Sequence, residues 1–516
     1  ASVTVLDETT QAFIGRSATI TATSGSVALS ASDDTSIVSV AGSLAAAGTA
    51  AVGIGADVGV VTKKTEAFIE SGVTATVEKD IAITATSSEN ITSVAAGLAA
   101  SGTVSIALDA SVHVLDIQAR AFIGDRPGDG LASAGAGNVH AGGNILISAD
   151  ESSEIDKIVG VLAVSGTAGI GAAGAVTVID KTTEAFIGEG AKVTADGKWS
   201  DAAVMSGALS TAIAGEASYD PNNAGDQGIQ TDKMSGVPSD AGALKGQGEV
   251  KTPQLSMDRE EDGVSDTTGG SFSGQRTSSV GLRPGFRGLS VTAANKDDIE
   301  VFTVSIAGGT VGVAISAGVN VVNTTTQAYI GNGALVNTDL STAGSTQSVN
   351  VAAANDFYHL AVAGTLAAGV VGVAPAVDVT VLSNHTFATI GAGATVQAKN
   401  DVTVEAHTRE DILLMGFGIA AGLVGVGGAV DVLTIDNTTY ASIGDATVWA
   451  GGDILVSSTD DTGVVQVSGA LAGGFVGVGA SVGVMVIDKD TQAFIADGAN
   501  VDALGNGTGL SEVLSG

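Results

Sequence analysis

A two-residue alternation of large aliphatic and very small residues recurs along this chain. In residues 424–432, Val alternates with Gly, Ala or Asp, with one break at Gly428. Comparable stretches begin at residues 51, 167, 310, 370 and 475, and their period of two predicts β-strands. A strand with water on one side would carry long polar side chains there, whereas the second face of these strands is mostly Gly and Ala. Both faces of each strand therefore need an explanation.

The alternation predicts a different role for each face. The Val face fits the core of a thin solenoid. The Gly and Ala face allows another backbone layer to lie closer than the usual sheet separation of about 10 Å. We therefore expect a close-packing face, with a partner layer from the same chain or a neighbouring molecule. A narrow solenoid interior is the simpler alternative. The clearest members of this face are Gly53, Gly55, Gly425, Gly427, Gly477 and Gly479.

A short motif, Ala-Phe-Ile-Gly or a variant, divides the chain into units. It begins at Ala12, Ala67, Ala121, Ala185, Ala328, Ala388, Ala441 and Ala493, at intervals of 55, 54, 64, 143, 60, 53 and 52 residues. Each unit consists of short β segments separated by turn residues, and no stretch has a helical period. Such units stack to bury a shared core. We predict an all-β, elongated repeat β-solenoid, similar to a β-helix, with eight units of about 54 residues. Each unit forms two coils, or one large coil with a folded-back hairpin.

One long insertion interrupts the repeats. Residues 198–287 contain four of the six prolines and are rich in Gly, Ser and Asp, as expected for a surface excursion. The solenoid then occupies residues 1–197 and 288–516, and its second part ends within a unit.

Polar residues recur at fixed offsets from the motif alanine. Two residues before it stand Thr10, Thr65, Thr183, Thr326, Thr386, Thr439 and Thr491. Five residues before it stand Asp7, Asp116, Asp180, Asp436 and Asp488. Both residue types accept hydrogen bonds in turns, so we expect ladders of polar side chains at a corner of the solenoid. A weak calcium site built from the Asp row is the alternative.

A second carboxylate row consists of Asp57, Asp378 and Asp431, each ten residues before its motif alanine. Asp378 and Asp431 fall in successive units, so they are expected to be near neighbours. Because like charges repel, two neighbouring carboxylates would either raise the pKa of one of them or bind a cation between them, here calcium. A strand end that reaches water is the other interpretation of this row.

Composition narrows the possible partners. The chain has 55 acidic against 21 basic residues, a net charge of −34, which disfavours nucleic acid and insertion into anionic membranes. It contains no cysteine, which excludes disulfides and thiolate chemistry. Residues 412–430 are apolar, but their Gly breaks and period of two argue against a membrane helix. The first residues lack the features of a signal peptide, so we expect a processed product or part of a longer protein.

Residues that could carry catalysis do not converge in the repeats. The five histidines fall in different registers of different units and show no metal-binding spacing. Gly479–Gly483 matches G-x-S-x-G, but lies inside a predicted strand rather than at a strand–turn–helix elbow. We therefore predict no catalytic residue, no bound cofactor and no enzymatic activity. The alternative is a carbohydrate-active β-helix enzyme of the lyase or hydrolase type.

The repeats resemble those of a known group of proteins. The segments "AFIGEGAKVTADG" (185–197) and "GVGGAVDVLTIDNTTYASIG" (425–444) are similar to repeats of giant bacterial surface adhesins of the filamentous-haemagglutinin-like and leukotoxin-like kind. The resemblance implies export to the bacterial cell surface, a β-helical shaft and a role in adhesion or matrix. We accordingly expect a structural or adhesive extracellular protein that self-associates, laterally or end to end, into a filament, sheath or matrix layer. A host or neighbouring-cell surface, or a glycan, is a further expected partner.

Overall fold

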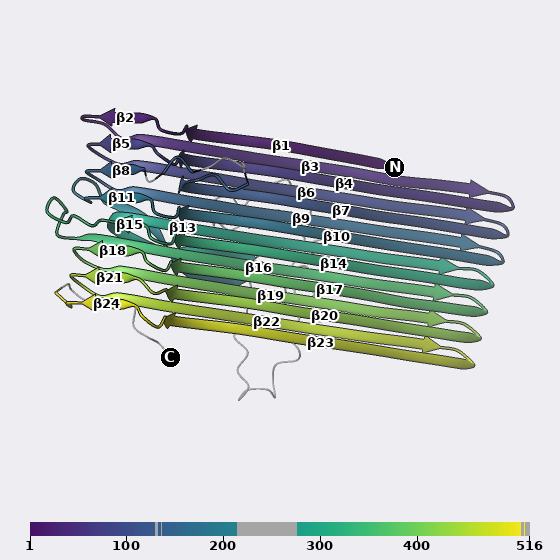
Figure 1. Ribbon diagram of the computed structural model, residues 1–516. Coiled ribbons are helices and arrows are strands. Elements are labelled where there is room, and N and C mark those ends of the chain that lie inside the picture. The colour runs from purple at the N-terminus through teal and green to yellow at the C-terminus, as the bar shows by residue number, and fades with distance from the viewer. Residues whose placement is uncertain (129–132, 136, 214–275, 507–509, 511–516) are drawn as a thin grey trace, which may run out of the picture.

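The computed structural model describes residues 1–128, 133–135, 137–213, 276–506 and 510. In these ranges the chain forms strands joined by short turns and contains no helix long and apolar enough to cross a membrane. The strands assemble into three parallel sheets, here called sheets A, B and C (Figure 1). The prediction of an all-β repeat solenoid is confirmed. Each complete repeat of the described residues makes one large coil with one strand in each sheet. The alternative of one large coil per unit is therefore confirmed, whereas the alternative of two coils and the folded-back hairpin are wrong.

Sheet A contains one long strand from every repeat. Neighbouring strands pair in register, so that each motif alanine lies beside the next, as Ala67 does beside Ala121. The eight strands, in spatial order, are β1 (Ser2–Ile14), β4 (Ala50–Glu70), β7 (Val104–Gly124), β10 (Ala168–Ile187), β14 (Val311–Ile330), β17 (Val371–Ile390), β20 (Val424–Ile443) and β23 (Val476–Ile495).

Sheet B is short and follows sheet A after a tight turn. Glycine is required in this turn where the backbone takes a positive φ, as at Gly72 (72°) and Gly190 (63°). Its strands are β2 (Thr19–Ala22), β5 (Thr74–Val77), β8 (Asn138–Ala141), β11 (Lys192–Ala195), β15 (Leu335–Val336), β18 (Thr395–Ala398), β21 (Thr447–Ala450) and β24 (Asn500–Ala503).

Sheet C lies opposite sheet A and leads back into it through a Gly-containing tip. Its strands are β3 (Val27–Ala47), β6 (Ile81–Ser101), β9 (Ile145–Ser165), β13 (Arg276–Gly308), β16 (Gln347–Ala368), β19 (Val402–Ala421) and β22 (Ile454–Gly473). The first part of β13 also pairs antiparallel with β12 (Ala202–Ile213), which forms a hairpin over the outer face of sheet C. Residues 214–275 of the predicted insertion lie outside the described residues. The apolar segment 412–430 is the end of β19, the tip and the start of β20.

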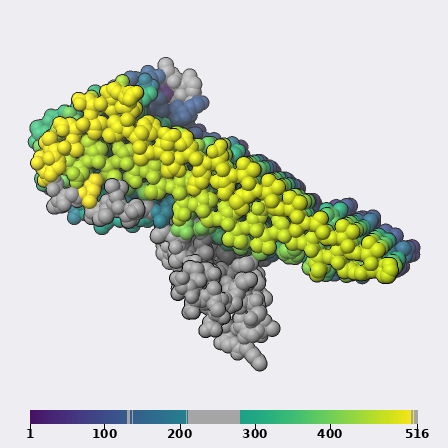
Figure 2. All heavy atoms as spheres, turned by 90° about the horizontal axis from the view of Figure 1, so that it is seen from below, coloured from purple at the N-terminus to yellow at the C-terminus, as the bar shows by residue number. Residues whose placement is uncertain are grey.

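The molecule tapers from sheet B toward the tips, as Figure 2 shows from below. At the wide end, Ile and Val side chains from all three sheets form a conventional core, including Ile69, Val77 and Ile83. Near the tips the inward apolar residues are alanines, such as Ala307, Ala314 and Ala367. The distance between sheets A and C therefore follows from the size of the side chains between them.

The Gly and Ala face of the sheet A strands points into this thin interior. A Cβ atom on Gly53 would lie 2.8 Å from the Ser43 hydroxyl oxygen, and one on Gly427 would lie 2.7 Å from the Gly418 carbonyl oxygen. The layer packed against the glycines thus belongs to the same chain, in sheet C. The prediction that the Val face forms the core is wrong, because sheet C leaves no space for larger side chains. Val52 and Ile54 instead point outward and are 57% and 65% exposed.

Candidate functional site

A row of inward-pointing charged residues, here called the interior polar seam, crosses the inside of the solenoid between sheets A and C and is buried except in the last coil. On sheet A the seam contains Lys63, Lys181 and Lys489, each four residues before a motif alanine. The carboxylates that face these lysines come from the middle of the sheet C strands. They are Asp33, Glu89, Glu151, Asp297, Glu410 and Asp460.

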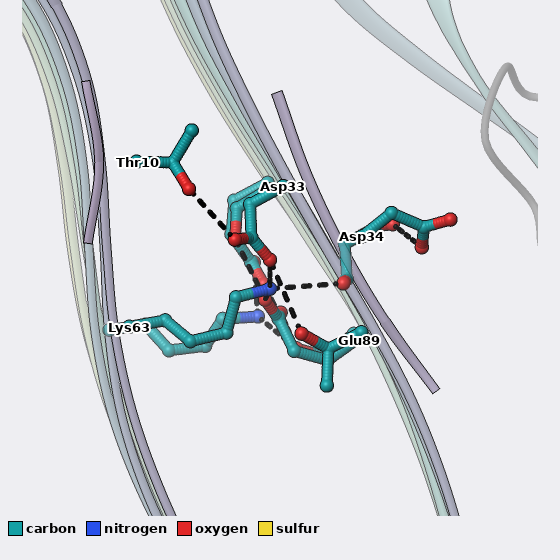
Figure 3. Close-up of polar contacts among 11 residues, drawn as sticks. Thr10, Asp33, Asp34, Lys63 and Glu89 are labelled. Carbon is teal, nitrogen blue, oxygen red and sulfur yellow. Dashed lines mark hydrogen bonds and ion pairs between the residues drawn. The ribbon is translucent and has the colours of Figure 1, made fainter. Parts of the chain in front are cut away.

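Lys63 forms the first cluster of the seam. Figure 3 shows its side chain reaching from sheet A to Asp33 and Glu89 on sheet C. Its Nζ atom lies 2.6 Å from Glu89 Oε1, and the lysine is only 1% exposed. Thr10 donates to Asp33 Oδ2 at 3.1 Å. Burial alone would lower the pKa of Lys63, but the carboxylates of Glu89 and Asp33 outweigh it and raise this pKa. Lys63 is therefore held in its charged form.

Lys181 forms a second cluster that continues the first. It makes ion pairs with Glu151 and Asp297 and donates to the Ser153 hydroxyl at 3.0 Å. The Ser153 hydroxyl lies within hydrogen-bond distance of both Glu151, at 2.9 Å, and Glu89, at 3.0 Å, and can donate to either, so the two clusters are connected. Burial and the neighbouring Glu89 raise the pKa of Glu151 well above its ordinary value, and its carboxyl group hydrogen-bonds to Glu89.

A further group of buried polar residues lies around Asp57, outside the lysine clusters of the seam. Asp57 accepts from Ser39 at 2.6 Å and Ser93 at 2.5 Å, and lies 3.6 Å from His113 Nε2. Burial lowers the pKa of His113 to about 4 and that of Lys157 to about 7. These residues are 4% exposed or less, so a substrate has no access to this arrangement of Ser, His and Asp.

The carboxylate row of Asp57, Asp378 and Asp431 lies inside the solenoid. Asp378 and Asp431 are partners in the β17–β20 ladder, whereas Asp57 is four strands away from Asp378. All three are 1% exposed or less, so the interpretation as strand ends that reach water is wrong. Burial and the adjacent Asp431 raise the pKa of Asp378 to about 7. Burial also raises the pKa of Asp431, whose carboxylate accepts from Ser468.

The two polar ladders predicted for a corner lie in the middle of sheet A instead. Thr10, Thr65, Thr183, Thr326, Thr386, Thr439 and Thr491 occupy one inward row. Asp7, Asp116, Asp180, Asp436 and Asp488 occupy an outward row. The corner prediction is wrong because a strand continues through both positions up to the motif. Within the described ranges no group of three or more His, Asp or Glu residues is placed to hold a metal ion. Calcium binding stays a prediction.

The outer surface near the tips carries a second feature, here called the apolar band. On sheet A it comprises the outward residues in the first half of each long strand. On sheet C it comprises those in the second half. One column of sheet A is valine in all eight strands: Val3, Val58, Val112, Val176, Val319, Val379, Val432 and Val484. One column of sheet C is Leu44, Leu98, Leu162, Ile306, Leu366, Ile419 and Leu471.

A cavity of about 420 Å³ lies between the β12–β13 hairpin and the outer face of sheet C. Its lining includes Thr86, Ser148, Asp150, Thr292 and Met205. Burial raises the pKa of Asp150 to about 6. Glu151 also lines the cavity, but its carboxylate contacts Lys181 on the inner side of the sheet.

Sequence reasoning missed the polar seam and the outward band. Lys63, Lys181 and Lys489 share an even offset from the motif alanine, which places them on its side of the strand. This even offset was the signal in the sequence that could have predicted the seam.

Comparison of the chain with known protein families, curated proteins and solved structures finds no match.

Proposed function

We propose that this chain is a structural, adhesive segment of an extracellular bacterial surface protein. It acts as a β-solenoid shaft that self-associates into a filament, sheath or matrix layer. The resemblance of its repeats to filamentous-haemagglutinin-like and leukotoxin-like adhesins favours this function. The observation that carries the proposal is the in-register stacking of whole repeats, in which every motif alanine lies beside that of the next coil. Such a coil extends a shaft by one layer for each repeat that the chain contains.

The distribution of charged groups supports a structural role over the carbohydrate-active alternative. Hydrolysis of a glycosidic bond needs two carboxyl groups that face one substrate, about 5–10 Å apart. The acidic residues that line the cavity under the hairpin are Asp150 and Glu151. Glu151 cannot serve as the second catalytic carboxyl group, because it forms an ion pair with Lys181 on the inner side of the sheet. The carboxylates of the interior polar seam lie inside the solenoid, and the outward row of Asp116, Asp180 and Asp436 lies on the outer face of sheet A.

The proposal is tested on the purified chain by negative-stain electron microscopy and by glycan assays. We expect flat particles that associate into larger assemblies, together with binding to a bacterial or host cell surface or to glycans, and no cleavage of polysaccharides. Cleavage that Asp150→Asn abolishes while the melting temperature is unchanged would overturn the proposal in favour of an enzyme.

A further inference from the structure

The apolar band excludes charge from one region of a highly acidic protein. The chain carries a net charge of −34, yet no column of the band contains an Asp, Glu, Lys or Arg residue. On sheet A the band ends at the outward row of Asp116, Asp180 and Asp436. On sheet C it ends near Asp156 and Glu300. Charged residues therefore border an uninterrupted apolar surface.

The exposure of the band does not come from the open ends of the solenoid. Leu108, Val114, Ile315 and Val426 are 37–41% exposed, although each lies in a strand paired on both sides. Monomeric proteins rarely expose continuous apolar patches larger than a few hundred Å², roughly 300–600 at most. On sheet A alone, five outward columns about 6.6 Å apart and eight strands about 4.8 Å apart give roughly 1,000 Å².

We infer that the apolar band of sheet A packs against the same band of a second copy of this chain. This inference rests on the proposed function and specifies the surface through which the shaft associates. A stable interface buries about 800 Å² on each partner, which the band can supply. In both copies the residues of each valine column repeat once per strand along the solenoid axis. The ridges of one face therefore have the same repeat as the grooves of the other along the whole face. A two-fold axis would relate the partners and close the contact.

A lipid surface fits the band less well than a second copy. Asp57, Asp109, Asp378 and Asp431 lie directly beneath it in the interior, and carboxyl groups at membrane depth are costly. Face-to-face packing at about 10 Å is the ordinary arrangement of two sheets with aliphatic faces. It leaves the acidic borders in water.

The test uses sedimentation velocity of the full chain over a range of micromolar concentrations. The variant Val176→Lys with Val319→Lys places two charges in the all-valine column of the band, on the two paired central strands. We expect it to weaken association at least about tenfold. The matched control is Thr182→Lys with Thr325→Lys, on the same two strands and the same face but outside the band. The control should associate as the wild type does.

A second measurement assigns the face without introducing charge. The chain has no cysteine, so pyrene can be attached to Val319→Cys on sheet A or to Leu366→Cys on sheet C. We expect excimer emission from Val319→Cys only. A monomeric wild type, equal association of both lysine variants, or excimers from Leu366→Cys alone would overturn the inference. So would binding of the monomer to lipid vesicles through the band. Assemblies that both lysine variants leave unchanged would refute this contact and leave the proposed self-associating shaft intact, whereas a monomeric wild type would contradict both.

Discussion

Lys181 is the most heavily engaged charged residue of the interior. Its ammonium group contacts Glu151, Asp297 and Ser153, and it is 1% exposed. Burial would lower its pKa, but the carboxylates of Asp297, Glu151 and Glu89 raise this pKa above its ordinary value. The lysine thus neutralises groups that could not remain ionised without it.

Replacing Lys181 with Met should strongly destabilise the protein. The variant leaves Glu151 and Asp297 buried without a cation, which costs about 3–5 kcal/mol in comparable buried pairs. Urea unfolding at pH 7 followed by circular dichroism measures the change. The control is Lys157→Met, which removes a buried lysine that contacts the Val176 carbonyl oxygen at 2.7 Å. Because burial lowers the pKa of Lys157 to about 7, this control should be neutral or stabilising. Equal losses in both variants would contradict the role of Lys181.

Asp378 should make stability depend on pH in an unusual direction. Its folded-state pKa, about 7, lies above the ordinary value of 3.8, because burial and Asp431 disfavour its charge. The folded state then holds more protons, and this residue's contribution to the free energy of unfolding falls as the pH rises from about 4 to about 7. Asp378→Asn should therefore be more stable than the wild type above pH 7 by about 4 kcal/mol, at about 1.4 kcal/mol for each pKa unit. The difference should vanish below pH 4 in thermal melts. A constant difference across this range would rule out the titration.

Whether a residue lies an even or an odd number of positions before the motif alanine determines which face of the strand it occupies, and this much could be predicted from the sequence. Thr183, Lys181 and Ala175 lie two, four and ten residues before Ala185, and all point inward with it. Asp180 lies five residues before it and points outward. The sequence revealed these rows and their neighbours, because the repeats stack in register. It did not reveal which parity faces inward, since neither face carries the long polar side chains of a solvated strand.

At the scale of elements, the small residues of sheet A set the thickness of the solenoid. Two sheets of about 20-residue strands face each other, and glycines such as Gly427 and Gly418 allow their backbones to approach. Hydrophobicity favoured the valines for the core. Their size excludes them from the interior, because sheet C lies too close to sheet A for valine side chains to fit between the two sheets.

Neighbouring glycines of β20 should respond in opposite ways to the same substitution. Gly427→Val places its Cβ 2.7 Å from the Gly418 carbonyl oxygen and 2.9 Å from that of Leu471, and should cost about 3 kcal/mol or more. Gly428→Val points outward, where the nearest atom lies 3.6 Å away. It should be neutral or stabilise the strand by about 0.5 kcal/mol. Chemical denaturation of both variants measures these changes. Similar losses would mean that the inward and outward faces are assigned incorrectly.

At the scale of the whole molecule, the longest dimension runs along the strands rather than along the solenoid axis (Figure 1). Twenty residues span about 66 Å, whereas eight stacked strands span about 34 Å. Each coil contacts only its neighbours through the same columns. The fold class and the repeat length were accessible from the sequence because both depend on these columns. The single coil per repeat was not, because its 20-residue strands exceed the usual strand length.

Removing one whole repeat should preserve the fold. Val371 and Val424 are partners in adjacent coils, so deleting residues 371–423 removes one complete coil and rejoins equivalent positions. We expect a cooperative thermal transition, and a particle about 4.8 Å shorter along the axis by small-angle scattering. Deleting residues 371–396 instead removes a partial coil and should give a chain that does not fold cooperatively. Equal behaviour of the two deletions would exclude nearest-neighbour stacking as the basis of stability.

The parallel ladders also determine how the protein would carry a mechanical load. Backbone hydrogen bonds between coils, such as those of β10 with β14, run along the solenoid axis from one strand to the next. A pull along that axis is shared by the bonds of two long strands and one short strand at the same time. Rupture of one coil from the next then requires these bonds to break together, so the molecule should be stiff and strong under axial tension.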